Sequence, residues 1–271
     1  MELTDKFETP PNKLEELFEI AIKYIHKKKG YKVEYLKEKD IKALIEETNN
    51  IFNKAIDFGI KDNEIPEEML TALRNNTFQF SAFKTHQQMK EVGKLLLDEN
   101  DKVKPFTKFK NDVAQINDDY NKNYLEAEYQ FAIGSSQQAA RWSEYSDDTE
   151  RYMLQYRTAD DDKVRASHQA LHEITLPKND PFWAAYYPPN GWRCRCSVVE
   201  VLARKYTKSD SEEAIKSGVI ATTKLNNSGK NTMEMFRFNP GQKNIVFPEK
   251  HPYYKDKKEV QSVINKLQNG K

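Results

Sequence analysis

The sequence has little of several features that define common protein classes. Its 271 residues include two cysteines, which excludes the disulfide framework of small secreted proteins. It contains no run of roughly 18 apolar residues, so no stretch is a candidate for a membrane-spanning helix. The N-terminal residues MELTDKFETPPNK lack the basic start and the apolar stretch of a secretory signal, so we expect an origin in a reducing cytoplasm.

The chain also lacks an excess of charge, since 43 basic and 42 acidic residues leave a net charge of +1. A nucleic-acid-binding domain usually carries a strong positive charge, so a chain-wide DNA-binding surface is not expected. Two local basic stretches, residues 102–110 and 193–205, are either candidate DNA contacts or solvated faces. The sequence contains no phosphate-binding glycine loop and no nucleophile elbow.

Helical periodicity is the main positive signal in the first half of the chain. Leu14, Phe18, Ile22 and Ile25 recur at intervals of three or four residues, and the segment 27–30 supplies cations and a glycine for a helix end. Similar stripes continue to residue 142. They predict helices over residues 12–29, from an Asp40 cap to a Gly59 end, from Pro66 to about Leu73, over 81–97 and over 106–142, with an interruption at 134–136 left open.

The second half is mixed. Residues 205–218 indicate a capped helix, and 219–247 contain apolar fragments between turns that indicate short strands or an extended arm. A final amphipathic helix includes Val260–Leu267. We therefore predict an α+β fold, with a mainly helical N-terminal half, then a compact irregular knot of chain with short strands, then a C-terminal arm. The predicted regions are an N-terminal arm at 1–11, a helical domain at 12–145, a core at 146–204 and a mixed extension at 205–271.

Residues 156–199, called the motif region below, concentrate the rare residue types of the chain. They hold both cysteines, two of the three tryptophans and two of the five histidines. His168 and His172 would share a face if their segment is helical, and Cys194 and Cys196 would share a face of a strand. Two imidazoles and two thiolates can bind tetrahedral zinc, although zinc-binding cysteines are usually separated by two or more residues. One interpretation is therefore a zinc site.

A second interpretation is a structural region without a ligand. Its arginines (Arg157, Arg165, Arg193 and Arg195) would pair with its aspartates (Asp160, Asp161, Asp162 and Asp180), and reduced cysteines would pack as small buried side chains. The aromatic rings would be buried, and the prolines would form a rigid turn. The residues assigned to this structural core are Tyr156, Arg157, Asp161, Arg165, Asp180, Pro181, Phe182, Trp183, Pro188, Pro189, Gly191 and Trp192.

A third interpretation is an enzyme. His168 would act as a general base near neutral pH, and Arg157 and Arg165 would grip a phosphate through paired hydrogen bonds. This arrangement would suit a small nuclease or a nucleotide-using toxin. The sequence offers no second unambiguous catalytic group, so from the residues alone all three interpretations stay open.

The order of motifs in this region resembles a known family, the phage Mu protein F-like minor head or head morphogenesis proteins of tailed phages. The motifs are YRTADDDKVRASHQAL at 156–171, DPFW at 180–183 and YPPNGWRCRCSVV at 187–199, and LEAEYQFAIGSSQQAARW at 125–142 resembles the helix that precedes them. His168, Cys194 and Cys196 match the family pattern. His172 falls at a variable position, so the resemblance suggests another ligand, such as an aspartate, if a metal is bound.

The resemblance implies a structural protein of the virion, not an enzyme. Such proteins are present in few copies, associate with the portal vertex or the capsid interior, and act in head assembly. The expected partners are portal protein, capsid or scaffold proteins and phage DNA, with no membrane. The expected location is the virion, after synthesis in the bacterial host cytoplasm. The alternative is a virion-carried nuclease or toxin-like enzyme that uses His168 with arginines or a bound metal.

Overall fold

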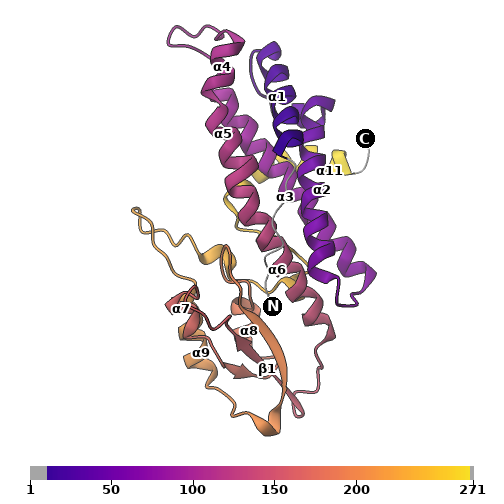
Figure 1. Cartoon of the computed structure of the whole chain (residues 1–271), viewed down its shortest axis with the longest axis vertical. Helices are drawn as coiled ribbons and strands as arrows, with labels where there is room; N and C mark the ends of the chain where they lie inside the picture. The colour runs from indigo at the N-terminus through magenta and orange to yellow at the C-terminus, as the bar shows by residue number, and fades with distance from the viewer. Residues whose placement is uncertain (1–10, 269–271) are drawn as a thin grey trace. The chain divides into compact units, whose positions relative to one another are not determined.

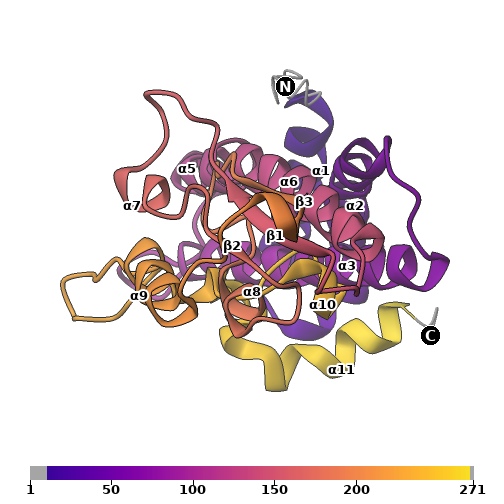
Figure 2. The same ribbon diagram turned by 90° about the horizontal axis from the view of Figure 1, so that it is seen from below.

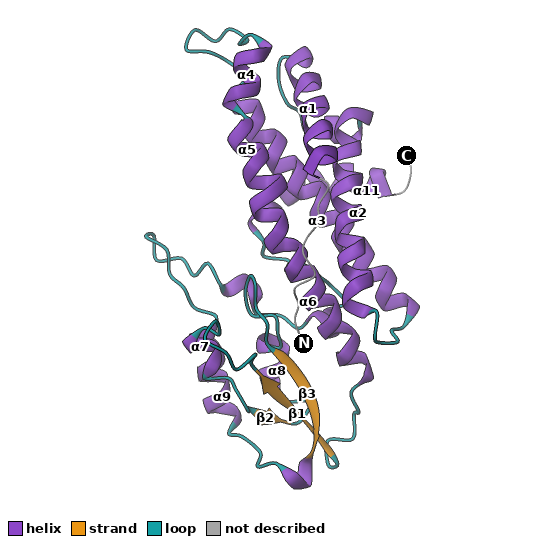
Figure 3. Ribbon diagram, in the orientation of Figure 1, coloured by secondary structure: helices purple, strands orange, loops and turns teal. Residues whose placement is uncertain are grey.

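The fold is described for residues 11–268 of a computed structural model, and it confirms the predicted α+β class. Helices dominate the first half, and a small three-stranded antiparallel sheet follows (Figure 1, Figure 3). Of the predicted N-terminal arm at 1–11, residues 1–10 lie outside the described residues. Within the described part of the chain, no helix combines the length and the apolar character needed to cross a membrane.

The described chain divides into two compact units, each built from segments that are distant in sequence. The helical unit contains residues 11–54, 75–129 and 251–268, and the sheet unit contains residues 55–74 and 130–250. Three helices contribute residues to both units: α2 (Lys39–Ile60), α3 (Glu67–Lys94) and α6 (Tyr124–Glu144). The compact units divide the chain differently from the four consecutive regions proposed from the sequence, because each unit gathers several separate segments. Those four regions stay a prediction.

The helical unit is built on amphipathic helices. Helix α1 (Pro11–Lys28) places Phe18, Ala21, Ile22 and Ile25 in the core, where each is at most 4% exposed, as their spacing predicts. Burial of such a stripe supplies most of the stability of a helix in a protein. The unit also contains α4 (Phe106–Asp112), α5 (Ala114–Asp118) and α11 (Lys257–Gln268), the final helix expected from the sequence.

Two predicted helix boundaries are wrong. Asp40 lies inside the first turn of α2, and Gly59 lies inside its last turn and does not end it. Close packing explains this glycine, because a Cβ at residue 59 would lie 2.2 Å from the Oγ of Ser136. The two helices predicted from Pro66 and over 81–97 are a single helix, α3.

The long helix predicted over 106–142 is interrupted, but not at residues 134–136. A turn at Val113 separates α4 from α5, and Asp119–Asn123 form one π-helical turn before α6. Residues 134–136 stay helical within α6. The two serine hydroxyls there find acceptors, since Ser135 donates to the carbonyl of Val246 at 2.8 Å and Ser136 donates back within the helix at 2.7 Å.

The sheet unit is organised around strand β1 (Tyr152–Arg157), which lies between β2 (Thr175–Leu176) and β3 (Ser197–Leu202) (Figure 2). Both pairings are antiparallel, and β1 pairs with β3 along its whole length. The motif region forms the connections between these strands. Helix α7 (Ala166–Gln169) precedes β2, and α8 (Pro181–Tyr186) precedes β3.

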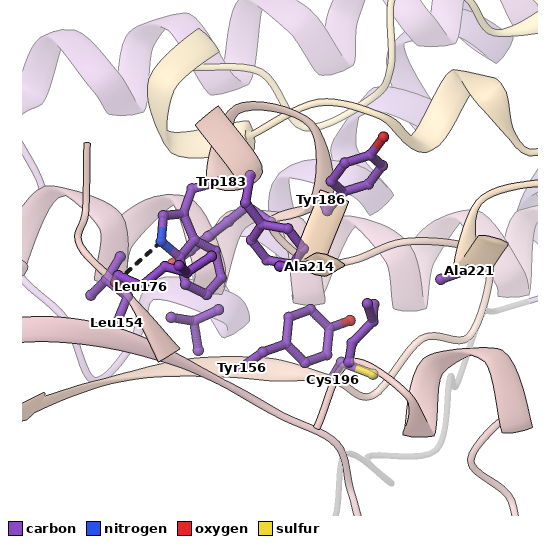
Figure 4. Close-up of a cluster of buried hydrophobic side chains, with 12 residues drawn as sticks. Leu154, Tyr156, Leu176, Trp183, Tyr186, Cys196, Ala214 and Ala221 are labelled. Atoms are coloured by element: carbon purple, nitrogen blue, oxygen red, sulfur yellow. Dashed lines mark hydrogen bonds between the residues drawn. The ribbon is translucent and has the colours of Figure 1, made fainter. Parts of the chain in front are cut away.

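The hydrophobic core of the sheet unit lies against one face of this sheet (Figure 4). Leu154 and Tyr156 alternate with Gln155 along β1, so both point to the same face. Trp183 of α8 is fully buried in this cluster, and its Nε1 donates to the carbonyl of Leu176 at 3.4 Å. The core thus combines the aromatic residues of the motif region with strand residues.

The described chain after β3 contains both helices predicted there, α9 (Ser211–Ala221) and α11, and none of the predicted strands. Helix α9 is capped by Asp210, which accepts from the backbone nitrogen of Glu213 at 2.9 Å, as the capped helix predicted at 205–218 requires. The described residues 219–247 form one isolated bridge between Leu225 and Asn231, a 3-10 turn and the short helix α10 (Pro240–Lys243). The prediction of short strands is therefore wrong for this segment, which consists of turns and short helical pieces with Phe236, Phe238 and Phe247 buried.

Candidate functional site

Three side chains of the motif region meet in one group, called the Cys/His cluster below: His168, Cys194 and Cys196. Their ligand atoms all lie within 4.8 Å of one another. His168 comes from α7, and the cysteines come from the segment that leads into β3. The Nδ1 atom of His168 lies 3.6 Å from the Sγ of Cys194 and 3.6 Å from the Sγ of Cys196. The structure thus brings together three of the four residues proposed as metal ligands.

Local hydrogen bonds position His168. Its backbone nitrogen donates to the carbonyl of Arg165 at 2.8 Å, and the guanidinium of Arg165 donates to the carbonyl of Trp192 at 2.5 Å. These bonds join α7 to the segment before the cysteines. The imidazole is 2% exposed, and its Nε2 has no hydrogen-bond partner among the described residues. The contacts of the ring are therefore made through Nδ1, which faces the sulfur atoms.

A tight turn positions the two cysteines. The backbone nitrogen of Cys194 donates to the carbonyl of Gly191 at 3.2 Å, and Arg193 within this turn has a left-handed φ of 57°. That conformation is uncommon for a residue with a side chain, and it turns the chain so that Cys194 faces His168. Cys196 is 9% exposed and lies beside the ring of Tyr156 (Figure 4).

The two thiols differ in acidity. Hydrogen bonds from Cys196 and His168 hold the pKa of the Cys194 thiol well below its usual range. The pKa of Cys196 is raised, because its contact with Cys194 and its burial both disfavour a second negative charge. Burial and the two cysteines also raise the pKa of Tyr156. A thiolate is the form of cysteine that binds metals, and both cysteines are free thiols.

His172 lies outside the Cys/His cluster. Helix α7 ends at Gln169, and Glu173 then has a left-handed φ of 65°, so the helical spacing that would align the two histidines does not continue. The Nδ1 of His172 instead lies 2.8 Å from the Oγ1 of Thr158 and accepts from its backbone nitrogen at 3.2 Å. In the part of the chain that the structure describes, no carboxylate joins the cluster as a fourth ligand.

One of the arginine–aspartate pairs proposed from the sequence is present. Arg195 donates two hydrogen bonds to Asp161, at 2.5 and 2.6 Å, and holds the pKa of Asp161 at about 2. Arg157 pairs with Glu173 instead, at 3.2 Å. Asp180 does not pair with an arginine in this network. Its carboxylate caps α8 by accepting from the helix backbone at 2.9 Å.

The other residues of the structural core surround the Cys/His cluster or pack beneath it. The Oη of Tyr156 donates to the Oδ1 of Asn190 at 2.8 Å, and both residues are fully buried. The rings of Phe182 and Trp183 are also fully buried, with centroids 4.8 Å apart. Trp192 packs edge-on against other aromatic rings of the sheet unit. Pro188, Pro189 and Gly191 are buried, whereas Pro181 is exposed at the start of α8.

Two polar residues of this region were missed in the sequence. Asn190 is fully buried and accepts from Tyr156, and Thr158 holds the ring of His172. The turn motif Pro-Pro-Asn-Gly marks Asn190 as a turn residue, and buried polar side chains in such turns usually serve as hydrogen-bond partners. Thr158 carries no comparable signal.

The geometry does not match the general-base interpretation of His168. The imidazole is 2% exposed and faces two sulfur atoms, so a substrate has no route to it in this arrangement. The two arginines expected to grip a phosphate are engaged elsewhere, Arg157 with Glu173 and Arg165 with a backbone carbonyl. The arrangement is suited to binding a soft metal ion or to holding two free thiols.

Part of the chain is similar to a known protein family and to two phage or prophage proteins. Residues 74–199 match the family described as "Phage Mu protein F like protein". The "Mu-like prophage FluMu F protein" of Haemophilus influenzae is 34% identical over 94 residues, which cover 32% of this chain. The "Putative capsid assembly protein F" of Escherichia phage Mu is 29% identical over 101 residues, which cover 36% of this chain. Each match spans 23% of the relative's own length, and no solved structure shows significant similarity.

Proposed function

We propose that this protein, whose residues 74–199 belong to the phage Mu protein F-like family, acts in head assembly of a tailed phage or prophage. Its place would be that of a minor structural protein at the portal vertex or on the capsid interior. The observation that carries the proposal is the similarity to a phage Mu protein whose name is that of a putative capsid assembly protein. The family match runs through the motif region as far as β3.

The structure supports a scaffold function for this region. The motifs of this region form a buried core and a Cys/His cluster whose imidazole is 2% exposed. Such a rigid core would hold the exposed residues of this region in fixed positions, where they could contact a partner protein. The enzyme alternative receives no support from a specific contact, because His168 is buried and its expected partner arginines are engaged.

Proteins are favoured over packaged DNA as partners. In the basic stretch 102–110, Lys104 pairs with Asp112 and Lys110 pairs with Glu19, each at 2.7 Å. In the stretch 193–205, Arg195 is held by Asp161. Cations that are already paired gain less from replacing counterions on DNA phosphates. We therefore propose portal, capsid or scaffold proteins as the main partners, with DNA contact as a weaker addition.

A co-assembly experiment tests the proposal. The tagged protein is expressed with the portal, scaffold and major capsid proteins of its phage, and heads and portal rings are separated by sedimentation. The expected result is a small number of copies that travel with portal rings or with complete heads. Absence of the protein from both fractions, under conditions where heads form, would overturn the proposal.

A nuclease assay on the same preparation distinguishes the enzyme alternative from the structural proposal. The structural proposal predicts that the purified protein leaves single- and double-stranded DNA and RNA intact, with and without added divalent metal. Cleavage that disappears in a folded His168→Ala variant would favour the enzyme and would contradict a purely structural function. The dependence of DNA binding on salt then measures how many phosphates the basic stretches contact.

A further inference from the structure

We propose that the Cys/His cluster binds one zinc ion through the Nδ1 of His168 and the Sγ atoms of Cys194 and Cys196, with a water molecule as the fourth ligand. The zinc ion fixes α7 to the turn that precedes β3. This site is independent of the proposed function in head assembly. Its evidence is the position of three side chains in the sheet unit.

The distances within the cluster match a zinc site. Zinc–sulfur bonds are about 2.3 Å and zinc–nitrogen bonds about 2.0–2.1 Å, so in a tetrahedral site a nitrogen and a sulfur ligand lie about 3.6 Å apart. Both sulfur atoms lie 3.6 Å from the Nδ1 of His168. Both nitrogen–sulfur separations are therefore those that a shared zinc ion requires, and all three atoms lie within 4.8 Å of one another.

A metal ion explains both contacts of the Nδ1 more directly than hydrogen bonds do. The Nδ1 of a neutral imidazole has one lone pair and accepts one hydrogen bond. Here two sulfur atoms, those of Cys194 and Cys196, lie at the same distance from the Nδ1 of His168. Only one of the two thiols can donate to it. A metal ion accounts for both contacts at once, because each of the three atoms then directs a lone pair to the same point.

The donor set selects the type of metal. Two sulfur atoms and one imidazole nitrogen favour zinc over calcium or magnesium, which prefer oxygen ligands. Charge balance also favours a divalent cation. Two neighbouring thiolates without a cation would be costly, because their charges repel and Cys196 is buried, whereas two thiolates, a neutral imidazole and Zn²⁺ sum to zero. Binding converts both thiols to thiolates and releases their protons to solvent.

A bound ion would join two short segments of the fold. Helix α7 is four residues long, far below the length at which a helix is stable by itself. The turn that carries Cys194 contains the left-handed residue Arg193, which costs conformational free energy. One ion with ligands on both segments joins them directly. The hydrogen bond from Arg165 to Trp192 supplies a second link between the same segments.

Water is assigned to the fourth position because no fourth side chain is placed there. Among the described residues, the cluster of candidate ligands contains three members, and His172 is held by Thr158 outside it. Cys194 is partly exposed, which gives solvent access to the site. His172 therefore provides a matched control: it is a histidine four residues from His168 that the structure excludes from the ligand set.

The zinc content of the full chain tests the proposal. The protein is purified under reducing conditions without chelators, and its metal content is measured by mass spectrometry together with its titration by Co²⁺. The expected result is about one zinc per chain and a cobalt form with the visible bands of tetrahedral coordination and the near-ultraviolet bands of cobalt–thiolate bonds. The absence of zinc and of these cobalt bands in protein with two free thiols would overturn the proposal.

Single variants identify the ligands. His168→Ala, Cys194→Ser and Cys196→Ser should each weaken zinc binding by at least about 100-fold, more than the loss typical of a residue behind the ligands. His172→Ala should bind zinc as the wild type does. Loss of zinc in the His172 variant, or its retention in all three ligand variants, would refute this ligand set. Circular dichroism in the far ultraviolet checks that each variant is folded. If a cysteine variant does not fold, the wild type is titrated with cobalt after alkylation of its thiols, which should abolish the cobalt–thiolate bands.

Discussion

The ammonium group of Lys84 and the carboxylate of Glu128 form an ion pair whose side chains are 2% and 3% exposed. Glu128 also accepts a hydrogen bond from the Oη of Tyr253 at 2.8 Å. Burial lowers the pKa of Lys84, whereas the contact with Glu128 opposes that change. Helix α3, helix α6 and the segment before α11 therefore meet at one buried charge pair in the helical unit.

Replacement of Glu128 by glutamine is expected to destabilise the protein strongly, because the ammonium of Lys84 would stay buried without a counter-charge. Breaking a buried ion pair from one side typically costs about 3–5 kcal/mol. Urea unfolding followed by circular dichroism would measure the loss. The double variant Lys84→Met with Glu128→Leu removes both charges and should recover most of it. Equal losses in the single and double variants would show that the uncompensated charge is not the cause.

The stability of the helical unit should depend on pH through His251. Burial and the charge of Lys84 lower the pKa of this histidine to about 3, from a usual value near 6.5. Between these values the unfolded chain binds a proton that the folded protein does not, so stability decreases as the pH falls through this window. The contribution is complete above pH 6.5 and is lost progressively toward pH 3.

His251→Asn tests this dependence with little change in structure. The asparagine can still accept from the backbone nitrogen of Tyr253, which the Nδ1 of His251 does at 3.2 Å, but it does not titrate. We expect its unfolding free energy to decrease less than that of the wild type between pH 6.5 and about 4. Burial also lowers the pKa of His86, so part of the decrease in unfolding free energy should persist in the variant. Parallel pH profiles for the two proteins would rule out a contribution from His251.

Asp180 should stabilise α8 as its N-cap and not as the partner of an arginine. Its Oδ1 accepts from the backbone nitrogen of Phe182 and from the Oγ of Ser211, each at 2.9 Å. Asp180→Ala is expected to cost about 0.5–2 kcal/mol in urea unfolding, the usual value of an N-cap. Asp180→Asn should cost less, because asparagine is also a good cap. A larger loss for asparagine than for alanine would point to the charge and not to the hydrogen bonds.

The sequence was most informative where one physical signal dominated. The stripe of Phe18, Ile22 and Ile25 predicted the buried face of α1, and the segment 205–218 predicted a capped helix, which is α9. The motif region was recognised by its residue types, and its two cysteines and His168 do lie together. Each of these inferences depends on local spacing or on a pattern of rare residues, which the sequence displays directly.

The two helices predicted in the place of α3 left out residues 74–80, which begin with the polar run Arg74–Thr77. Polar side chains of α3 are nevertheless buried: Thr77 and Ser81 fully, and residues 84–88 to at most 3% exposed. Their partners are distant in sequence: Thr77 donates to Asn53 at 3.3 Å, and Lys84 pairs with Glu128. Hydrophobic periodicity does not register a buried polar face, so only the tertiary contacts reveal the continuous helix.

The position of His172 could not be predicted from its spacing. The argument for a shared face with His168 required the helix to continue for just over one turn beyond that residue, whereas α7 covers Ala166–Gln169 alone. The left-handed φ of 65° at Glu173 belongs to a residue type with no special preference for that conformation. The pairing of β1 with β2 sets this turn, and strand pairing is a tertiary feature that local sequence does not encode.

Gly59 and Gly134 should respond in opposite ways to substitution by alanine. In α2, a Cβ at residue 59 would lie 2.2 Å from the Oγ of Ser136 and 2.6 Å from the carbonyl oxygen of Ile133, so Gly59→Ala should cost about 1–3 kcal/mol in urea unfolding. In α6, a Cβ at residue 134 meets no atom within 4 Å, so Gly134→Ala should gain up to about 1 kcal/mol from helix propensity. A stabilising Gly59→Ala would show that this contact is absent in solution.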